Sequence, residues 1–162
     1  MTAKDVYKTN MGMADFLLKE YVSDLSDADI LQRPAAGLNP LAWQIGHLIA
    51  SEQSMLKAIG KNMPDLPAGF EAAHNRDAAA SDKTTGFLKK DQYLALNDTI
   101  RAATLKALDT TPDAELDKPS PESFRAYAPT VGAVFGMIAS HVMMHVGQFV
   151  PLRRKLNKPV KI

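Results

Sequence analysis

The sequence contains no cysteine among its 162 residues. This absence excludes disulfides, thiolate metal ligands and a cysteine nucleophile, and it suits a reducing compartment. An excess of one charge is also missing, because 19 Lys and Arg residues oppose 18 Asp and Glu residues for a net charge of +1. The overall charge therefore attracts neither nucleic acid nor an anionic membrane surface, and we predict neither as a partner.

Long hydrophobic runs are absent as well. The first ten residues, MTAKDVYKTN, have no apolar core of signal-peptide length. No stretch approaches the roughly 18 unbroken apolar residues of a membrane span. Hydrophobic residues make up 46% of the chain and charged residues 23%, an ordinary globular mixture. We predict one domain over residues 1–162, located in the cytoplasm.

Strand signals are scarce, because apolar and polar residues do not alternate and β-branched residues are few between the helical segments. Helical periodicity is clear instead. We predict four long helices, over residues 5–25, 39–60, 90–108 and 130–156. In the second helix, Asn39 is suited to the N-cap, Pro40 to the first turn and Gly60 to the end. The fold class is therefore all-α, a four-helix bundle with a long crossover between helices 2 and 3.

The crossover runs from Lys61 to Lys89 and contains two prolines and two glycines. We predict one short helix in it, around residues 70–75. Structureless links of this length are uncommon and often functional, although a simple crossover between non-adjacent helices is an equal alternative. His74 lies in this segment and is expected to be a solvated loop residue, with a fourth metal ligand or a lid residue as the alternatives.

The stretch HVMMHVGQ places His141 and His145 one helical turn apart in an otherwise apolar run. At about 100° per residue, His145 falls within the apolar stripe of its helix and His141 at its edge. Buried imidazoles need partners for their nitrogens. The pair therefore indicates either a shared metal ion or two hydrogen-bonded core histidines.

Two residues of the second helix bear on this choice. His47 lies on a flank of that helix beside the small residues Gly46 and Ala50, a position that permits a meeting with the fourth helix without requiring it. Glu52 falls inside the apolar stripe. It is interpreted as a core acid paired with an arginine, and the alternative is a partner of a ligand histidine.

Other features of the sequence concern packing. Gly132, Gly136 and Ser140 indicate a close helix crossing, either inside the bundle or at a dimer interface. Pro151 should kink the fourth helix because its ring clashes with the carbonyl of Gly147.

Four further side chains have two interpretations each. Arg153 and Arg154 are expected to lie in solvent at the C-terminal end of the helix, where positive charge is favourable, with anion binding as the alternative. Tyr93 and Tyr127 are expected to serve packing, with substrate orientation as the alternative.

Three segments, NPLAWQIGHLIASEQ, HVMMHVGQF and LRRKLNKP, together resemble the DinB-like (DinB/YfiT) superfamily in order and spacing, and LQRPAAGLNP fits the same pattern. The resemblance covers nearly the whole chain. It implies a four-helix bundle with a long crossover, often a homodimer, that binds a divalent metal. Carried over residue by residue, it implies the metal ligands His47, His141 and His145. Imidazole ligands suit zinc, nickel, iron and copper.

Three histidines leave coordination positions open, as in catalytic metal sites. Val142 stands where a zinc protease of the H-E-x-x-H type has its glutamate, so a peptidase is not expected. The resemblance implies a metal-dependent enzyme, either a transferase of a low-molecular-weight thiol such as bacillithiol or mycothiol to a small electrophilic substrate, or a hydrolase. The alternatives are a non-catalytic metal-binding stress or sensor protein and a structural dimerisation module.

Overall fold

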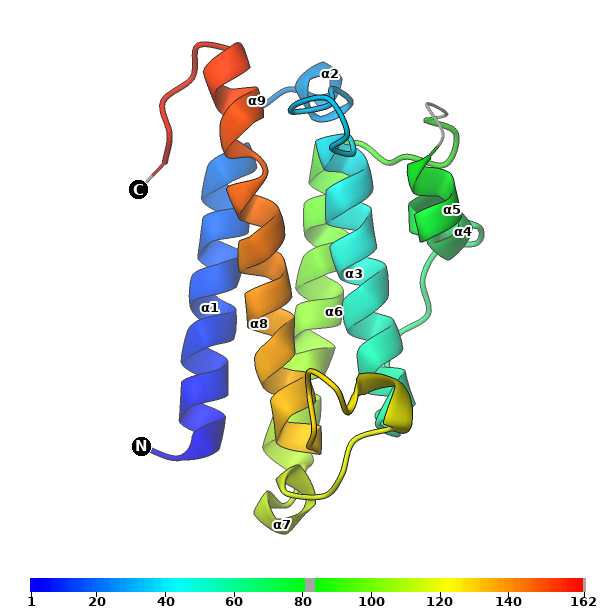
Figure 1. Ribbon diagram of the computed structural model, residues 1–162, viewed down its shortest axis with the longest axis vertical. Coiled ribbons are helices and arrows are strands. Elements are labelled where there is room, and N and C mark those ends of the chain that lie inside the picture. Colours follow the sequence, from blue (N-terminus) through cyan, green and yellow to red (C-terminus); the bar gives the residue numbers. More distant parts are fainter. Residues whose placement is uncertain (81–83, 162) are drawn as a thin grey trace.

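Four long helices form a bundle in the computed structural model, which describes residues 1–80 and 84–161. The helices are α1 (Ala3–Val22), α3 (Leu41–Ala58), α6 (Lys90–Thr110) and α8 (Val131–Gly147). Helix α8 packs against α1 and α3, and α6 packs against the same two helices from the other side (Figure 1). Their apolar faces meet in a shared hydrophobic core. The all-α fold class is confirmed.

The direction of the helices explains the length of the crossover. In Figure 1, α3 and α6 run the same way, so the chain between them must return along the bundle. It does so on the outer side of α3 and carries two short helices, α4 (Phe70–His74) and α5 (Arg76–Ala79). The short helix predicted around residues 70–75 is confirmed as α4.

The remaining short helices lie in the links between the long ones or, for one of them, after the last long helix. They are α2 (Asp27–Ile30), α7 (Asp113–Leu116), the 3-10 helix η1 (Glu122–Phe124) and α9 (Val150–Lys155). Apart from α9, none of these was predicted. A single helical turn has too few residues to show an apolar period.

The start of α3 differs from the prediction at one residue. Pro40, not Asn39, occupies the N-cap, and it makes no side-chain capping bond. The carbonyl of Asn39 instead accepts a hydrogen bond of 2.8 Å from the Gln44 amide. The end of α3 is as predicted, because Gly60 adopts a φ of +77° just after the last turn.

The predicted continuous helix over 130–156 is wrong, because the chain is interrupted after Gly147. Thr130 caps α8 as predicted, and its side chain accepts from the backbone N–H of Ala133. The chain then turns at Gln148 and resumes as α9. Pro151 has no N–H to bond to the carbonyl four residues back, so the expected kink takes the form of a break just beyond the histidine pair.

The glycines of α8 serve a contact inside the bundle. A Cβ atom at Gly132 would lie 2.9 Å from the hydroxyl of Tyr7 in α1, and one at Gly136 would lie 3.2 Å from the same ring. The close crossing is therefore that of α8 with α1. A homodimer stays a prediction.

Arg153 anchors α9 to α1. Its side chain is fully buried and forms a 2.7 Å ion pair with Asp24 and a 2.7 Å hydrogen bond to the carbonyl of Tyr21. Both interpretations drawn from the sequence are wrong for Arg153, since its side chain is not in solvent at a helix end and is already paired with a carboxylate. Arg154 is exposed, as expected for a residue at the end of a helix.

The stretch Val131–Lys155 is long and apolar enough, by length and composition, to cross a membrane, and 44% of that window is buried inside the bundle. A core helix of a helical bundle meets the same criterion, and α8 is such a helix.

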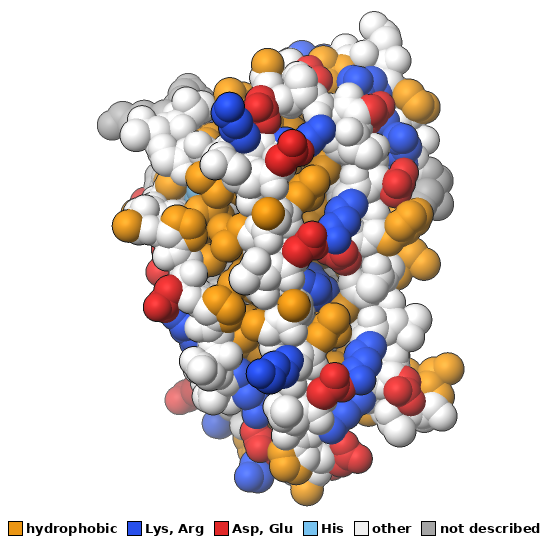
Figure 2. All heavy atoms as spheres, turned by 180° about the vertical axis from the view of Figure 1, so that it is seen from behind, with side chains coloured by type: hydrophobic (Ala, Val, Ile, Leu, Met, Phe, Trp, Pro, Cys, Tyr) orange, Lys and Arg blue, Asp and Glu red, His pale blue; other side chains and the backbone are white. Residues whose placement is uncertain are grey.

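On the face of the molecule seen from behind Figure 1, positive and negative side chains are interspersed (Figure 2). Ion pairs cross there from α1 to α6, including Lys19 with Asp98 and Lys8 with Asp109.

Candidate metal centre

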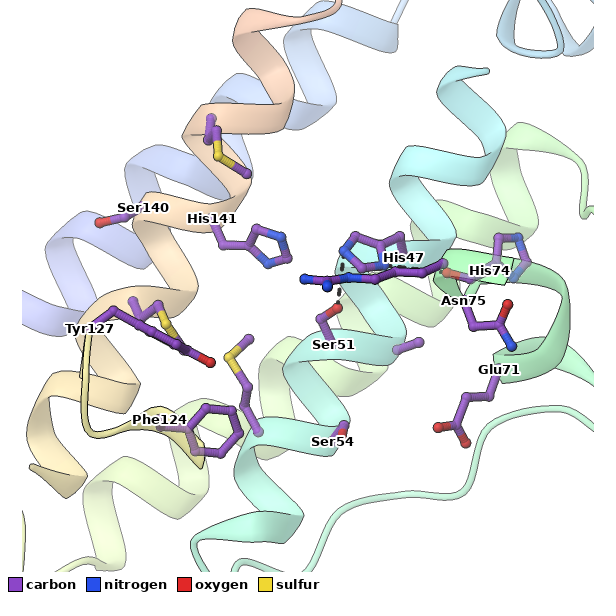
Figure 3. A pocket seen from close by; sticks show the side chains of 15 residues that line it. His47, Ser51, Ser54, Glu71, His74, Asn75, Phe124, Tyr127, Ser140 and His141 are labelled. Atoms are coloured by element: carbon purple, nitrogen blue, oxygen red, sulfur yellow. Dashed lines mark hydrogen bonds between the residues drawn. The ribbon is translucent and has the colours of Figure 1, made fainter. Parts of the chain in front are cut away.

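Three histidines from two helices converge at one end of a cleft. His47 comes from α3, and His141 and His145 come from α8. One nitrogen from each ring lies within 4.8 Å of the nitrogens of the other two. The ring centroids are 4.9 to 5.4 Å apart, and His47 and His141 point toward each other in Figure 3. The helical wheel permitted this meeting of α3 with α8, and the packing of the bundle produces it.

The orientation of His47 is set by the crossover. Its Nδ1 lies 3.3 Å from the backbone carbonyl of His74. A carbonyl oxygen only accepts, so Nδ1 carries the proton and the Nε2 of the neutral ring keeps its lone pair. Trp43 stacks on the ring at 4.7 Å, with 9° between the planes, and its own N–H donates to the carbonyl of Asn75. The hydroxyl of Ser51 donates to this Nε2 over 3.4 Å.

His145 is oriented by a glutamine in the same way. Its Nδ1 donates to Oε1 of Gln44 over 3.0 Å. The amide nitrogen of Gln44 donates to the carbonyl of Asn39, so the oxygen of that amide must face the imidazole. Nε2 of His145 is therefore left with a lone pair, as in His47. Hydrogen bonds from the second nitrogen of an imidazole are typical around metal-ligating histidines.

Burial keeps the three imidazoles neutral at physiological pH. It lowers the pKa of His141 to about 4, with a further contribution from His47, and that of His145 to about 3, with further contributions from His141 and His47. Burial also lowers the pKa of His47, against a hydrogen bond to the His74 carbonyl that raises it. Neutral imidazole is the form that binds a metal ion.

This arrangement fits a divalent metal ion. Two nitrogens at about 2.1 Å from one zinc ion lie at most about 4.2 Å apart. The nitrogens here lie within 4.8 Å of one another, close to that limit. Two of the neutral rings, those of His47 and His145, are oriented by hydrogen bonds to a carbonyl and an amide oxygen. The structure thus brings together the three residues that the resemblance implied as ligands.

His74 is neither a solvated loop residue nor part of the cluster. It is 1% exposed, its Nδ1 lies 2.7 Å from the carbonyl of Phe70, and its Nε2 lies 2.7 Å from the hydroxyl of Tyr93. Its ring stacks on Phe87 and lies against Gly46. The expectation of a solvated side chain is therefore wrong. His74 fixes the crossover to α3, and its carbonyl orients His47.

Two other interpretations drawn from the sequence are confirmed. Glu52 is buried and forms a 2.9 Å ion pair with Arg101 of α6, so it is a core acid paired with an arginine. Tyr93 is fully buried in the core.

A cleft of about 590 Å³ opens beside the triad. Its walls are α3, α8, the crossover and the loop around η1 (Figure 3). Phe124 and Tyr127 point into it from that loop, and Ser51 and Ser54 line it from α3. Tyr127 is 61% exposed, so it is a wall residue rather than a core residue. This volume is that of a small-molecule site.

The sequence profile of the DinB superfamily matches residues 17–149. The chain belongs to the DinB superfamily. A crystal structure of a conserved protein from Enterococcus faecalis has the same fold, with a TM-score of 0.68 and 18% sequence identity over 98% of this chain and 99% of that chain. No curated protein matches the sequence. The region shared with the DinB superfamily includes all three histidines of the triad.

Several residues of this DinB site were not predicted. Gln44 lies three residues before His47 on the same helix flank, and this spacing was the available signal. Trp43 lies one helical turn before His47. The carbonyls of His74 and Asn75 leave no trace in the sequence, because any residue provides a carbonyl.

Proposed function

We propose that this DinB-superfamily protein is a divalent-metal-dependent enzyme that transfers a low-molecular-weight thiol to an electrophilic substrate. The metal ligands are His47, His141 and His145. The observation that carries the proposal is the position of three neutral imidazoles, two of them oriented by hydrogen bonds, at one end of a cleft of about 590 Å³. A reacting molecule in this cleft reaches the metal directly.

The donor set supports a reactive ion. Three imidazoles leave coordination positions open, and zinc, nickel and iron accept such ligands. When bound, the ion supplies Lewis acidity, which lowers the pKa of a coordinated thiol or water or polarises a carbonyl.

The chain's own residues bind and orient the reactants. Phe124, Met137 and Met144 give the cleft an apolar wall that displaces water. The hydroxyls of Ser51 and Tyr127 provide hydrogen bonds within it. Because the chain has no cysteine, a thiol that reacts here must come from a small molecule.

The cleft favours an enzyme over a non-catalytic metal protein. A stress or sensor protein that only binds metal has no need of a small-molecule cavity beside the ion. A structural dimerisation module requires neither the cavity nor neutral imidazoles held in one tautomer. Both alternatives are tested by the experiment below.

The first part of the experiment is elemental analysis of protein purified without a histidine tag, wild type beside the His141→Ala, His145→Ala double variant. We expect about one metal ion per wild-type chain, and almost none in the variant. A wild-type chain that binds no zinc, nickel or iron above background overturns the proposal.

The second part measures turnover. Metal-loaded protein is mixed with bacillithiol or mycothiol and monochlorobimane, and formation of the fluorescent thioether is followed. We expect catalysis by the wild type and only the uncatalysed rate with the double variant. Metal binding without turnover on thiols, together with turnover of an ester, would identify a hydrolase. Metal binding without either activity would identify a non-catalytic metal protein.

A further inference from the structure

We propose that the cleft beside the triad binds an anionic small molecule with an apolar body, and that Arg76 holds its anionic group. The proposal rests on the proposed function, because it names the class of molecule that meets the metal. Arg76 is the first residue of α5.

The charge of the site is the first reason. Three neutral imidazoles leave a divalent ion with both of its positive charges, and no ligand of the triad is a carboxylate. The charged residues that line the described cleft are Arg76 and Glu71. In Figure 3 the carboxylate of Glu71 points away from His47, past Ser54. A bound ion would be the largest local charge, and Arg76 adds to it, so the site attracts anions.

The position of Arg76 is the second reason. It follows Asn75, whose carbonyl accepts from Trp43 and whose side chain accepts from the N–H of Ala78. The backbone at Arg76 is thus fixed relative to the helix that carries His47. Arg76 lines the same cleft as His47 and His141.

Arg76 is also available for a ligand. It is exposed, and it forms no ion pair within residues 1–80 and 84–161. This distinguishes it from Arg101 and Arg153, which are buried and paired with carboxylates. A planar guanidinium is suited to a bidentate contact with a carboxylate or phosphate.

The shape of the cleft defines the rest of the molecule. Phe124, Tyr127, Met137 and Met144 form a side of the cleft that comes from α8 and the loop before it. Aromatic and thioether side chains of this kind accept an apolar group of variable shape. A ligand with an anionic group and an apolar body therefore fits the cleft, with the anionic group at Arg76 and the apolar body against this side.

The test uses zinc-loaded protein, with phenylacetate and its neutral amide, phenylacetamide, as probes for isothermal titration calorimetry. The variants are Arg76→Gln and, as a matched control, Arg154→Gln, which removes an exposed arginine of α9. The zinc content of each protein is measured first. We expect phenylacetate to bind the wild type at least about tenfold more tightly than phenylacetamide does. Arg76→Gln should weaken phenylacetate by about tenfold and leave phenylacetamide unchanged, and Arg154→Gln should change neither.

Failure of this proposal is distinct from failure of the proposed function. Full zinc content with equal phenylacetate affinity in wild type and Arg76→Gln overturns the anion site alone. Equal affinity of the wild type for phenylacetate and phenylacetamide also overturns the anion site alone. Absence of zinc from the wild type overturns the proposed function, and the comparison of wild type with Arg76→Gln on metal-free protein then decides the role of Arg76.

Discussion

Nδ1 of His145 lies 3.0 Å from Oε1 of Gln44, across 101 residues of sequence. The bond joins α8 to α3 and sets the tautomer of His145. Gln44 thus determines whether His145, one of the proposed ligands, presents a lone pair to the site.

Replacing Gln44 by leucine should weaken zinc binding by about 10- to 100-fold, because the imidazole of His145 loses the acceptor that orients it. The free energy of unfolding of the metal-free protein should fall by about 1–3 kcal/mol, since the Asn39 carbonyl and His145 Nδ1 are left without their partner. Competition with a chromogenic zinc chelator measures the affinity.

The matched control for that variant is Gln53→Leu. Gln53 is buried in the same helix, and its amide donates to the carbonyl of Pro64 over 2.7 Å, away from the triad. The Gln53→Leu variant should be less stable than the wild type but should bind zinc with the same affinity. Equal zinc affinity in the two variants would contradict the role assigned to Gln44.

Replacing Gly46 by alanine should destabilise the protein by about 1–3 kcal/mol, because the new Cβ would fall on the ring of His74. The shift of His74 should also weaken zinc binding, since its carbonyl orients His47. Urea unfolding and zinc titration measure the two effects. In the control, Gly12→Ala, the Cβ atom of a helical residue meets nothing within 4 Å. It should stabilise the protein by about 0.5–1 kcal/mol. A Gly46→Ala variant as stable as wild type would refute the contact.

Replacing Glu52 by leucine should cost about 3–5 kcal/mol, because Arg101 is left as a buried charge without its partner. The double variant Glu52→Leu, Arg101→Met should recover most of this loss, since it removes both charges. Urea unfolding of the wild type, both single variants and the double variant gives the coupling energy. Additive losses would show that the two side chains do not interact.

The ion pair of Asp24 with Arg153 should make the free energy of unfolding depend on pH in the acid range. The Arg153 side chain lowers the pKa of Asp24 to about 2, below its ordinary value of 3.8. The unfolded chain then binds a proton at a higher pH than the folded one, so the contribution of Asp24 is fully present above pH 4 and is lost as the pH falls toward 2. Asp24→Asn should be less stable at pH 7 and show a shallower loss between pH 4 and pH 2.

Urea midpoints measured across this pH range test the effect. The control is Asp65→Asn, because the side chain of Asp65 is 98% exposed. It should follow the wild-type curve. An Asp24→Asn curve parallel to that of the wild type would show that the ion pair does not contribute.

The helices could be predicted because their signals are local. The apolar period placed four long helices, and Gly60 and Thr130 marked two of their ends. The break near Pro151 was predicted as a kink because the missing N–H is a property of the residue itself. The N-cap of α3 was misplaced by one residue, since the side-chain oxygen of Asn39 accepts a hydrogen bond from Arg33 instead of capping the helix.

The site could be predicted only in part, because its residues come from segments far apart in the chain. Spacing gave the pair His141 and His145, and His47 followed only from the resemblance to a family. His74 and Arg153 were misinterpreted because their burial depends on how the crossover and α9 pack. Such packing depends on tertiary contacts, which leave no periodic pattern in the local sequence.

The order of the helices along the chain also determines when the site can form during synthesis. A nascent chain that ends before residue 130 already contains His47, the His74 carbonyl and Arg76, and has neither histidine of α8. Since domains are made from the N-terminus onward, two of the three proposed ligands are synthesised with the last long helix. Metal binding at the proposed site would therefore be a late step of biogenesis, because a chain truncated before α8 has only one of the three histidines and lacks the wall of the cleft that α8 forms.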